Sequence, residues 1–220
     1  KDKYYGLRMK AIRALNMKND DIHDAALPIL TSLVQSDENT LVRASALTAL
    51  SKLKIQANMN MYQQALKSES YAIQGAALAG INQLDPAQAL QIAKGFEKDN
   101  RGILTQSIVA VYAENGNSAE WPFVYNQFST ASTGGKFGLV RNFAKMTARI
   151  DNSADAQQGI EELKQMGIKY KAITGIGPFL TGLLNNIKEQ RATLKDDASV
   201  KAADDALKAV AEVKDAKETK

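Results

Sequence analysis

The feature that most constrains the fold is an internal repeat of an alanine-rich helical segment. Each full copy is nine residues long: an apolar residue, a polar residue, two variable residues, a small residue, an apolar residue, a variable residue, a small residue and a final apolar residue. Its first, fifth, sixth and ninth positions therefore share one face of a helix. Four copies begin at Leu7, Val42, Ile73 and Ile103, and a looser copy covers residues 139–146. A less regular helix separates successive copies, which predicts helical hairpins that stack because one hairpin cannot bury its own apolar face.

The repeat predicts an all-α chain of about twelve helices, arranged as a helical-hairpin solenoid, a right-handed α-α superhelix. The fifth position of each copy is small, so neighbouring helices can approach closely; these residues are Ala11, Ala46, Ala77 and Ser107. The alternative is a non-repeating bundle whose helices look alike because all amphipathic helices do. Both alternatives are all-α, and they differ in whether hairpins stack in a regular order.

Turn residues mark the helix boundaries. Asp20 or Asp21 is expected to cap a second helix that contains Pro28, and Asn39 or Thr40 a third. Asp85 precedes a proline suited to a first helical position. Glycines and a proline at 175–178 predict a break. We expect one repeat domain over residues 1–195, completed over 196–220 by a one-faced capping helix and a frayed tail.

Charge and composition narrow the classes of function. The 220 residues contain 28 basic and 24 acidic side chains, a net charge of +4, and residues 191–220 contribute none of it. This excess is too small to predict nucleic-acid binding. No apolar run is long enough to span a membrane. We expect a soluble domain, either cytoplasmic or periplasmic. Because the chain starts at Lys1 without a signal peptide, we expect it to be part of a longer protein.

No motif in the sequence predicts catalysis or metal binding. Cysteine is absent and His23 is the only histidine, so a zinc site has too few ligands. The aspartates beside His23 suit the start of a helix. Residues 133–136 (TGGK) lack the spacing of a phosphate-binding loop. We therefore expect no catalytic residue, no metal ligand and no cofactor in this chain.

Arginine recurs at similar repeat positions, at Arg8, Arg43 and Arg141. One interpretation is structural: a row of arginines that hold adjacent repeats together by binding carboxylates or carbonyls. The other is a basic row on the concave face that grips an acidic partner or a peptide. Tyr4 and Tyr5 are the candidate contacts with another domain.

Two resemblances add to this pattern. Residues 38–50 read ENTLVRASALTAL and resemble the inner helix of a HEAT repeat. Residues 2–15 read DKYYGLRMKAIRAL and are similar to the start of the C-terminal helical-repeat region of bacterial zinc aminopeptidases of the aminopeptidase N family. Residues 177–179 (GPF) and 185–191 (NNIKEQR) resemble the closing helices of that region.

The second resemblance implies a lid, not an enzyme. In that family the helical region packs on an upstream catalytic domain, which holds the zinc, and restricts access to the peptide cavity. The implied partners are that catalytic domain and the peptide substrate, and the implied parent is a metallopeptidase. The rival hypotheses are a free-standing HEAT-like scaffold that binds a protein on its concave face and a helical-repeat nucleic-acid binder.

Overall fold

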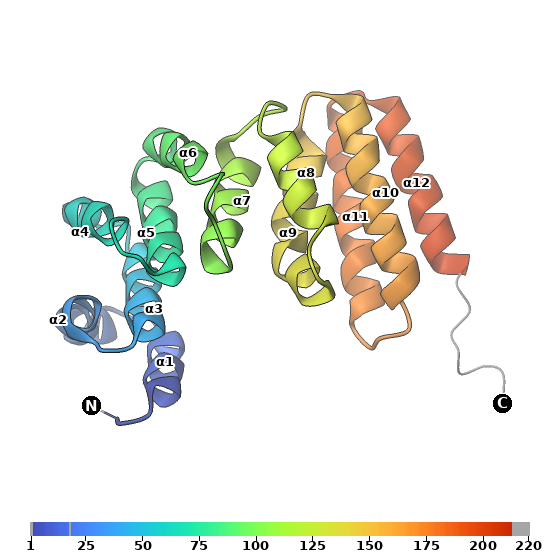
Figure 1. Cartoon of the computed structure of the whole chain (residues 1–220). Coiled ribbons are helices and arrows are strands. Elements are labelled where there is room, and N and C mark those ends of the chain that lie inside the picture. Colours follow the sequence, from blue (N-terminus) through green and yellow to red (C-terminus); the bar gives the residue numbers. More distant parts are fainter. Residues whose placement is uncertain (1, 18, 213–220) are drawn as a thin grey trace. The chain divides into compact units, whose positions relative to one another are not determined.

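The prediction of an all-α chain is confirmed. The computed structural model describes residues 2–17 and 19–212, and in these it has twelve α-helices, one short 3-10 helix and no strand (Figure 1). In chain order they are α1 (Tyr5–Ala14), α2 (Asp20–Ser36), α3 (Thr40–Ser51), η1 (Gln56–Asn58), α4 (Met59–Ala65), α5 (Tyr71–Leu84), α6 (Pro86–Gly95), α7 (Ile103–Asn115), α8 (Trp121–Ser129), α9 (Thr133–Arg149), α10 (Ser153–Tyr170), α11 (Ile176–Thr193) and α12 (Asp197–Glu212). They form two compact units, Lys1–Val111 and Tyr112–Lys220.

The first unit is organised around α3 and α5, which pack on each other. Helix α3 also contacts α1 and α2, while α5 contacts α4 and α6. Figure 1 shows α2, α4 and α6 on the same side of the row formed by α1, α3 and α5. The four face positions of the second and third repeat copies are fully buried: Val42, Ala46, Leu47, Leu50, Ile73, Ala77, Leu78 and Ile81. The repeat face of the sequence is therefore the core of this unit.

Two glycines let helices approach α5 more closely than any side chain would allow. A Cβ on Gly75 would lie 2.8 Å from backbone atoms of Ile103 and Leu104 in the first turn of α7. A Cβ on Gly80 would lie 2.5 Å from the ring of Tyr62, which is itself buried. The glycines therefore fix how closely α7 and α4 pack on α5.

The second unit is built from the end of α7 and helices α8 to α12. Phe128 and Phe143 stack with their ring centroids 3.9 Å apart, and Trp121 lies 5.3 Å from Phe143. Helix α12 packs on α10 and α11. It buries Ala203 and Val210 and exposes charged residues on its other side, including Lys201, Asp205 and Lys208. This one-faced pattern is what a terminal helix needs to cover a core and face water.

Most predicted boundaries agree with the structure, with one correction. Asn39 caps α3 by accepting hydrogen bonds from the backbone of the next turn, and Asp85 caps α6 in the same way. The prediction of Asp20 or Asp21 as the cap of α2 is wrong. Asn19 has the extended backbone of a cap, and its side chain accepts from Ile22 N at 3.1 Å. The amide side chain one residue earlier takes the role because α2 already begins at Asp20.

The predicted break before α11 is confirmed, because α10 ends at Tyr170 and Gly175 has a φ of 81°. The predicted boundary at residue 195 falls in the link before α12. The predicted frayed tail lies at 213–220, outside the described residues. Across the part of the chain that the structure describes, every helix is too short or too polar to span a bilayer.

Candidate protein-interaction site

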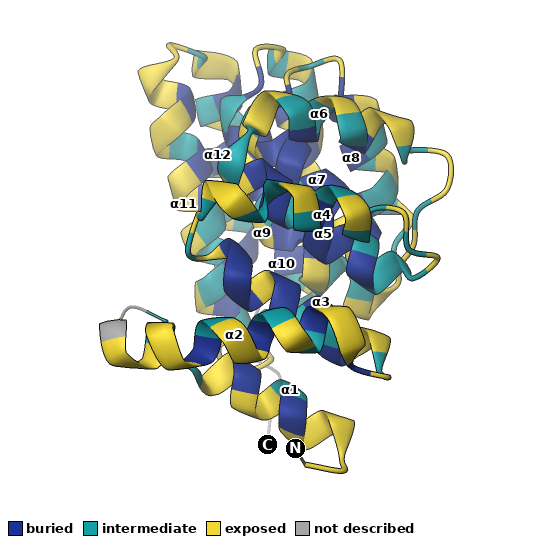
Figure 2. Cartoon of the chain, turned by 90° about the vertical axis from the view of Figure 1, so that its left-hand side faces the viewer, coloured by how far each residue is buried: buried dark blue, intermediate teal, exposed yellow. Residues whose placement is uncertain are grey.

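An open apolar groove of about 990 Å³ separates α1 from α2. These two helices both pack on α3, and apolar side chains of each remain uncovered between them. Both helices carry long exposed stretches (Figure 2). The residues that line the groove are Asp2, Leu7, Arg8, Ala11, Ile12, Leu15, Ala26, Pro28, Ile29, Leu30, Ser32, Leu33 and Ser36. We call this surface the α1/α2 groove.

The groove exposes repeat positions that are core elsewhere. Leu7 is the first position of the first copy and is 52% exposed, whereas its counterpart Val42 has no exposed surface. Ala11 is also exposed, whereas its counterpart Ala46 is fully buried. Across the groove, Ile29 of α2 is 62% exposed. In the second copy all four face positions are packed, whereas in the first copy Leu7 and Ala11 are exposed while Ile12 is buried.

Arg8 lies at the edge of the groove and is almost completely buried. Its guanidinium pairs with Asp37 at 2.8 Å and donates to the backbone oxygens of Asp2 and Lys3. Its Nε is buried and has no hydrogen-bond acceptor in the described part of the chain. A buried donor without an acceptor is energetically costly.

Arg43 occupies the same repeat position in the second copy. Its Nε donates to the backbone oxygen of Val34, in the last turn of α2, at 2.8 Å. In the second copy, therefore, the helix that precedes the repeat helix supplies the acceptor that Arg8 Nε lacks.

The two tyrosines predicted to contact another domain stand at the start of α1. Tyr4 is 71% exposed and Tyr5 is 51% exposed. Tyr4 is the residue before α1, and its backbone N–H donates to the Asp2 carboxylate at 2.7 Å. Large exposed aromatic side chains are the type most enriched at interface centres. Their contact with a partner stays a prediction.

Arg141, the third predicted arginine, is exposed and belongs to the second unit, whereas Arg8 and Arg43 belong to the first. Its guanidinium carbon lies 4.6 Å from the centroid of the Phe179 ring. Two other arginines bind the ends of helices there. Arg149 Nε donates to the backbone oxygen of Ala113 at 2.8 Å, and Arg191 donates to the backbone oxygen of Ile150. Sequence reasoning missed both, although each lies in the last turn of its helix.

Arg191 also pairs with Asp196, in the link that leads to α12. Burial acts to raise the pKa of the Asp196 carboxyl. Hydrogen bonds from Ser199, Ser153 and Arg191 act in the opposite direction and hold that pKa well below its usual range. The carboxylate is therefore bound in its charged form and joins three helices of the second unit.

We predict that Asp196 makes the second unit sensitive to acid. Because its folded pKa lies below the unfolded value of about 3.9, the stabilisation is complete above about pH 5 and is lost progressively as the pH falls towards the folded pKa. Urea unfolding followed by fluorescence of Trp121, the only tryptophan, measures this directly. Wild type should lose more stability between pH 6 and pH 2.5 than Asp196→Asn does. Parallel pH curves for the two proteins would contradict the assignment.

The described residues contain no cluster of three or more His, Cys, Asp or Glu side chains that could hold a metal ion. His23 Nδ1 lies 2.7 Å from the carboxylate of Asp24, its neighbour in the first turns of α2. No family model matches this sequence, and comparisons with curated proteins and with solved structures give no match either. The candidate site is therefore defined by its geometry alone, as an open apolar groove.

Proposed function

We propose that this chain is a non-catalytic accessory domain of a zinc aminopeptidase of the aminopeptidase N family. In this proposal its helices form a HEAT-like, right-handed solenoid that packs on the catalytic domain and restricts the access of peptides to the active site. The observation that carries the proposal is the α1/α2 groove, in which repeat positions that are core in the second copy are open to solvent.

The repeat itself specifies what fits the groove. Helix α2 precedes α3 and packs on it, and α4 precedes α5 and packs on it. Among the described residues no helix precedes α1 and packs on it, and Leu7 and Ala11 of α1 are exposed. A helix of the catalytic domain, seated on α1 as α2 is seated on α3, would cover them.

Arg8 supports the same occupant. A helix seated on α1 in this way would end beside Arg8, as the last turn of α2 lies beside Arg43. The last carbonyls of a helix have no N–H partner inside it, and a small shift that uncovers Arg8 Nε would let one of them accept from it. Docking would bury apolar surface and satisfy a buried donor in one step.

The resemblance to the aminopeptidase family rests largely on the same residues. The segment 2–15 that carries it contains Tyr4, Tyr5, Leu7 and Arg8, which lie at or beside the groove. In this proposal the zinc and the groups that activate water belong to the catalytic domain. The present chain contributes a wall that excludes bulk water and large substrates.

The proposal predicts a direct complex that the groove controls. The isolated chain should bind the purified catalytic region of the aminopeptidase encoded in the same genome, measured by titration calorimetry. Ala11→Arg should weaken binding at least tenfold, because it places a charge where apolar contact is needed. Ala14→Arg, on the same helix but outside the groove, is the matched control and should bind as wild type does.

Catalysis provides a second readout. The isolated chain should not cleave aminoacyl anilides. The complex should cleave them while cleaving long, unfolded polypeptides more slowly than the catalytic region alone. A chain that fails to bind, or that binds equally well with Ala11→Arg, would overturn the docking. Binding without any change in substrate-length preference would overturn the lid role.

A further inference from the structure

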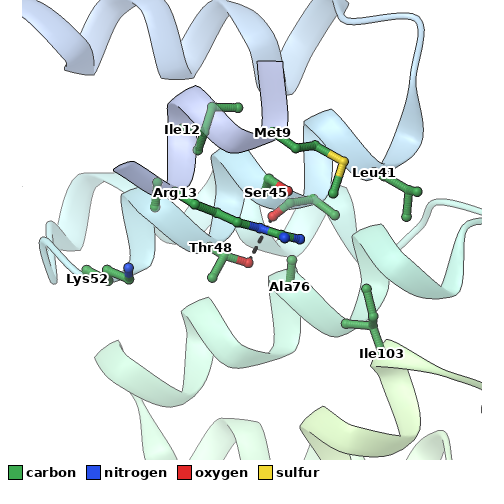
Figure 3. Close-up of a pocket in the computed structure, with 11 residues that line it drawn as sticks. Met9, Ile12, Arg13, Leu41, Ser45, Thr48, Lys52, Ala76 and Ile103 are labelled. Carbon is green, nitrogen blue, oxygen red and sulfur yellow. Dashed lines mark hydrogen bonds between the residues drawn. The ribbon is translucent and has the colours of Figure 1, made fainter. Parts of the chain in front are cut away.

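A second, smaller pocket lies on the row of helices α1, α3 and α5, where the first turn of α7 begins (Figure 3). Its volume is about 140 Å³. Apolar side chains form its floor and one side: Met9 and Ile12 from α1, Leu41 from α3, Ala76 from α5 and Ile103 from α7. Leu41 and Ile103 are 38% and 40% exposed, so their apolar surface is open to a ligand.

Two cationic side chains line this pocket. Arg13 reaches across it from α1, towards Ser45 and Thr48, and Lys52 lies beyond Thr48 at the end of α3 (Figure 3). Neither Arg13 nor Lys52 has a hydrogen bond or an ion pair in the part of the chain that the structure describes. Thr48 Oγ1 donates to the backbone oxygen of Ala44 at 2.9 Å and keeps its lone pairs available. Every polar group that lines the pocket and is free to pair is therefore a cation or a hydroxyl.

The charge of the surrounding helices has the same sign. Helices α1, α3 and α5 together contain four basic residues, Arg8, Lys10, Arg13 and Arg43, and no acidic residue. The acidic residues near these helices in the chain include those at positions 2, 20, 21, 24, 37 and 38, and Asp37 pairs with Arg8. Lys10, Arg13 and Arg43 have no carboxylate partner among the described residues, and such a local excess of one sign attracts an oppositely charged partner and speeds its association.

We propose that this pocket binds an acidic peptide segment of a partner protein. One aliphatic side chain of the segment enters between Met9, Leu41 and Ile103. A carboxylate beside it pairs with the Arg13 guanidinium, which offers a planar pair of N–H donors suited to a carboxylate, and a second carboxylate reaches Lys52.

The size of the pocket favours a peptide side chain over a metabolite. Sites for small organic ligands are clefts of about 300–1,000 Å³ that enclose most of the ligand. This pocket is smaller and open, so it can hold one side chain while the rest of the ligand stays on the surface. An extended segment would continue along the uncharged surface of α5, which has no charged residue at all.

This inference does not rest on the proposed docking at the α1/α2 groove. Arg13 lines this pocket and not that groove, and Leu7 and Ala11 line the groove and not this pocket. Variants at the two places therefore separate the two proposals.

The test is fluorescence anisotropy with a labelled nine-residue peptide that has a central leucine between glutamates and aspartates at its ends. We expect the full chain to bind it with a micromolar dissociation constant that weakens as salt rises. Arg13→Met, which keeps the apolar stem and removes the charge, should weaken binding at least tenfold. Lys52→Met should have a smaller effect, and the peptide with serine in place of leucine should bind at least tenfold more weakly.

Lys10→Met is the matched control. Lys10 is on the same helix as Arg13, has no partner among the described residues, and does not line the pocket. The two variants lose the same charge, so equal losses would show a general electrostatic attraction and overturn the pocket. Loss of the leucine requirement would overturn it too. Tighter binding of a single-stranded oligonucleotide than of the peptide, with the same Arg13 dependence, would replace the peptide by a nucleic acid.

Discussion

Replacing Arg191 by alanine should destabilise the second unit by about 3–5 kcal/mol. Arg191 is only 1% exposed, and its guanidinium serves both the Asp196 carboxylate and the backbone oxygen of Ile150. Removing it leaves a carboxylate and a carbonyl without their donors in a water-poor environment. Urea unfolding monitored through Trp121 fluorescence measures the loss, because that tryptophan is buried in the same unit.

Two further variants distinguish the effect of breaking the buried Arg191–Asp196 pair from the effect of removing an arginine in general. Arg141→Ala removes an exposed arginine that lies over the Phe179 ring and should cost less than about 1 kcal/mol. Combining Arg191→Met with Asp196→Ala should be less damaging than Arg191→Ala alone, because no carboxylate is then left unpaired. If Arg191→Ala cost no more than Arg141→Ala, the structural role assigned to Arg191 would be wrong.

Gly75→Ala should destabilise the first unit by roughly 1–3 kcal/mol. Alanine normally stabilises a helix by about 1 kcal/mol relative to glycine, so helix propensity alone would predict a gain in stability where we expect a loss. The reason is that the new Cβ would meet the backbone of Ile103 and Leu104 at 2.8 Å, and backbone cannot move aside as a side chain can. Urea unfolding followed by circular dichroism measures the change.

Gly182→Ala is the matched control for this substitution. Gly182 lies inside α11, and a Cβ there would have no atom within 4 Å. The same change should therefore stabilise the protein, by up to about 1 kcal/mol. A Gly75→Ala protein as stable as wild type would show that α5 and α7 do not approach as closely as the structure has them.

Local chemistry explains why the helices could be predicted. Asn39 and Asp85 cap helices through their own side chains, and the glycine at 175 adopts a conformation that other residues avoid. These effects act within a few residues, so they can be predicted from the sequence. The repeat face was equally legible in the second and third copies, because its apolar positions recur at helical spacing.

The partners of the arginines, which lie far away in the chain, could not be predicted from the sequence in the same way. Arg141 fits the repeat position of Arg8 and Arg43, yet Arg149 and Arg191 bind the carbonyls of preceding helices in the second unit. The choice depends on where another helix ends, some 36 to 41 residues away in the chain. Sequence spacing contains no information about that distance in space.

The exposed tyrosines and the α1/α2 groove also differ in how far the sequence predicts them. Tyr4 and Tyr5 are predicted as contacts with another domain, and both are exposed at the start of α1. The groove itself could not be predicted, because Leu7 and Ala11 match the buried pattern of the other copies. Only the arrangement of α1, α2 and α3 shows that these two residues have no cover.

Hydrogen exchange on the isolated chain, with and without the aminopeptidase catalytic region, tests whether the α1/α2 groove is the docking surface. We expect exchange to slow in α1 and in the second half of α2, the two walls of the groove. Exchange in α12, which faces solvent on its outer side, should stay unchanged. Unaltered exchange in α1 and α2 under conditions where the two proteins bind would contradict the claim that this groove is the docking surface.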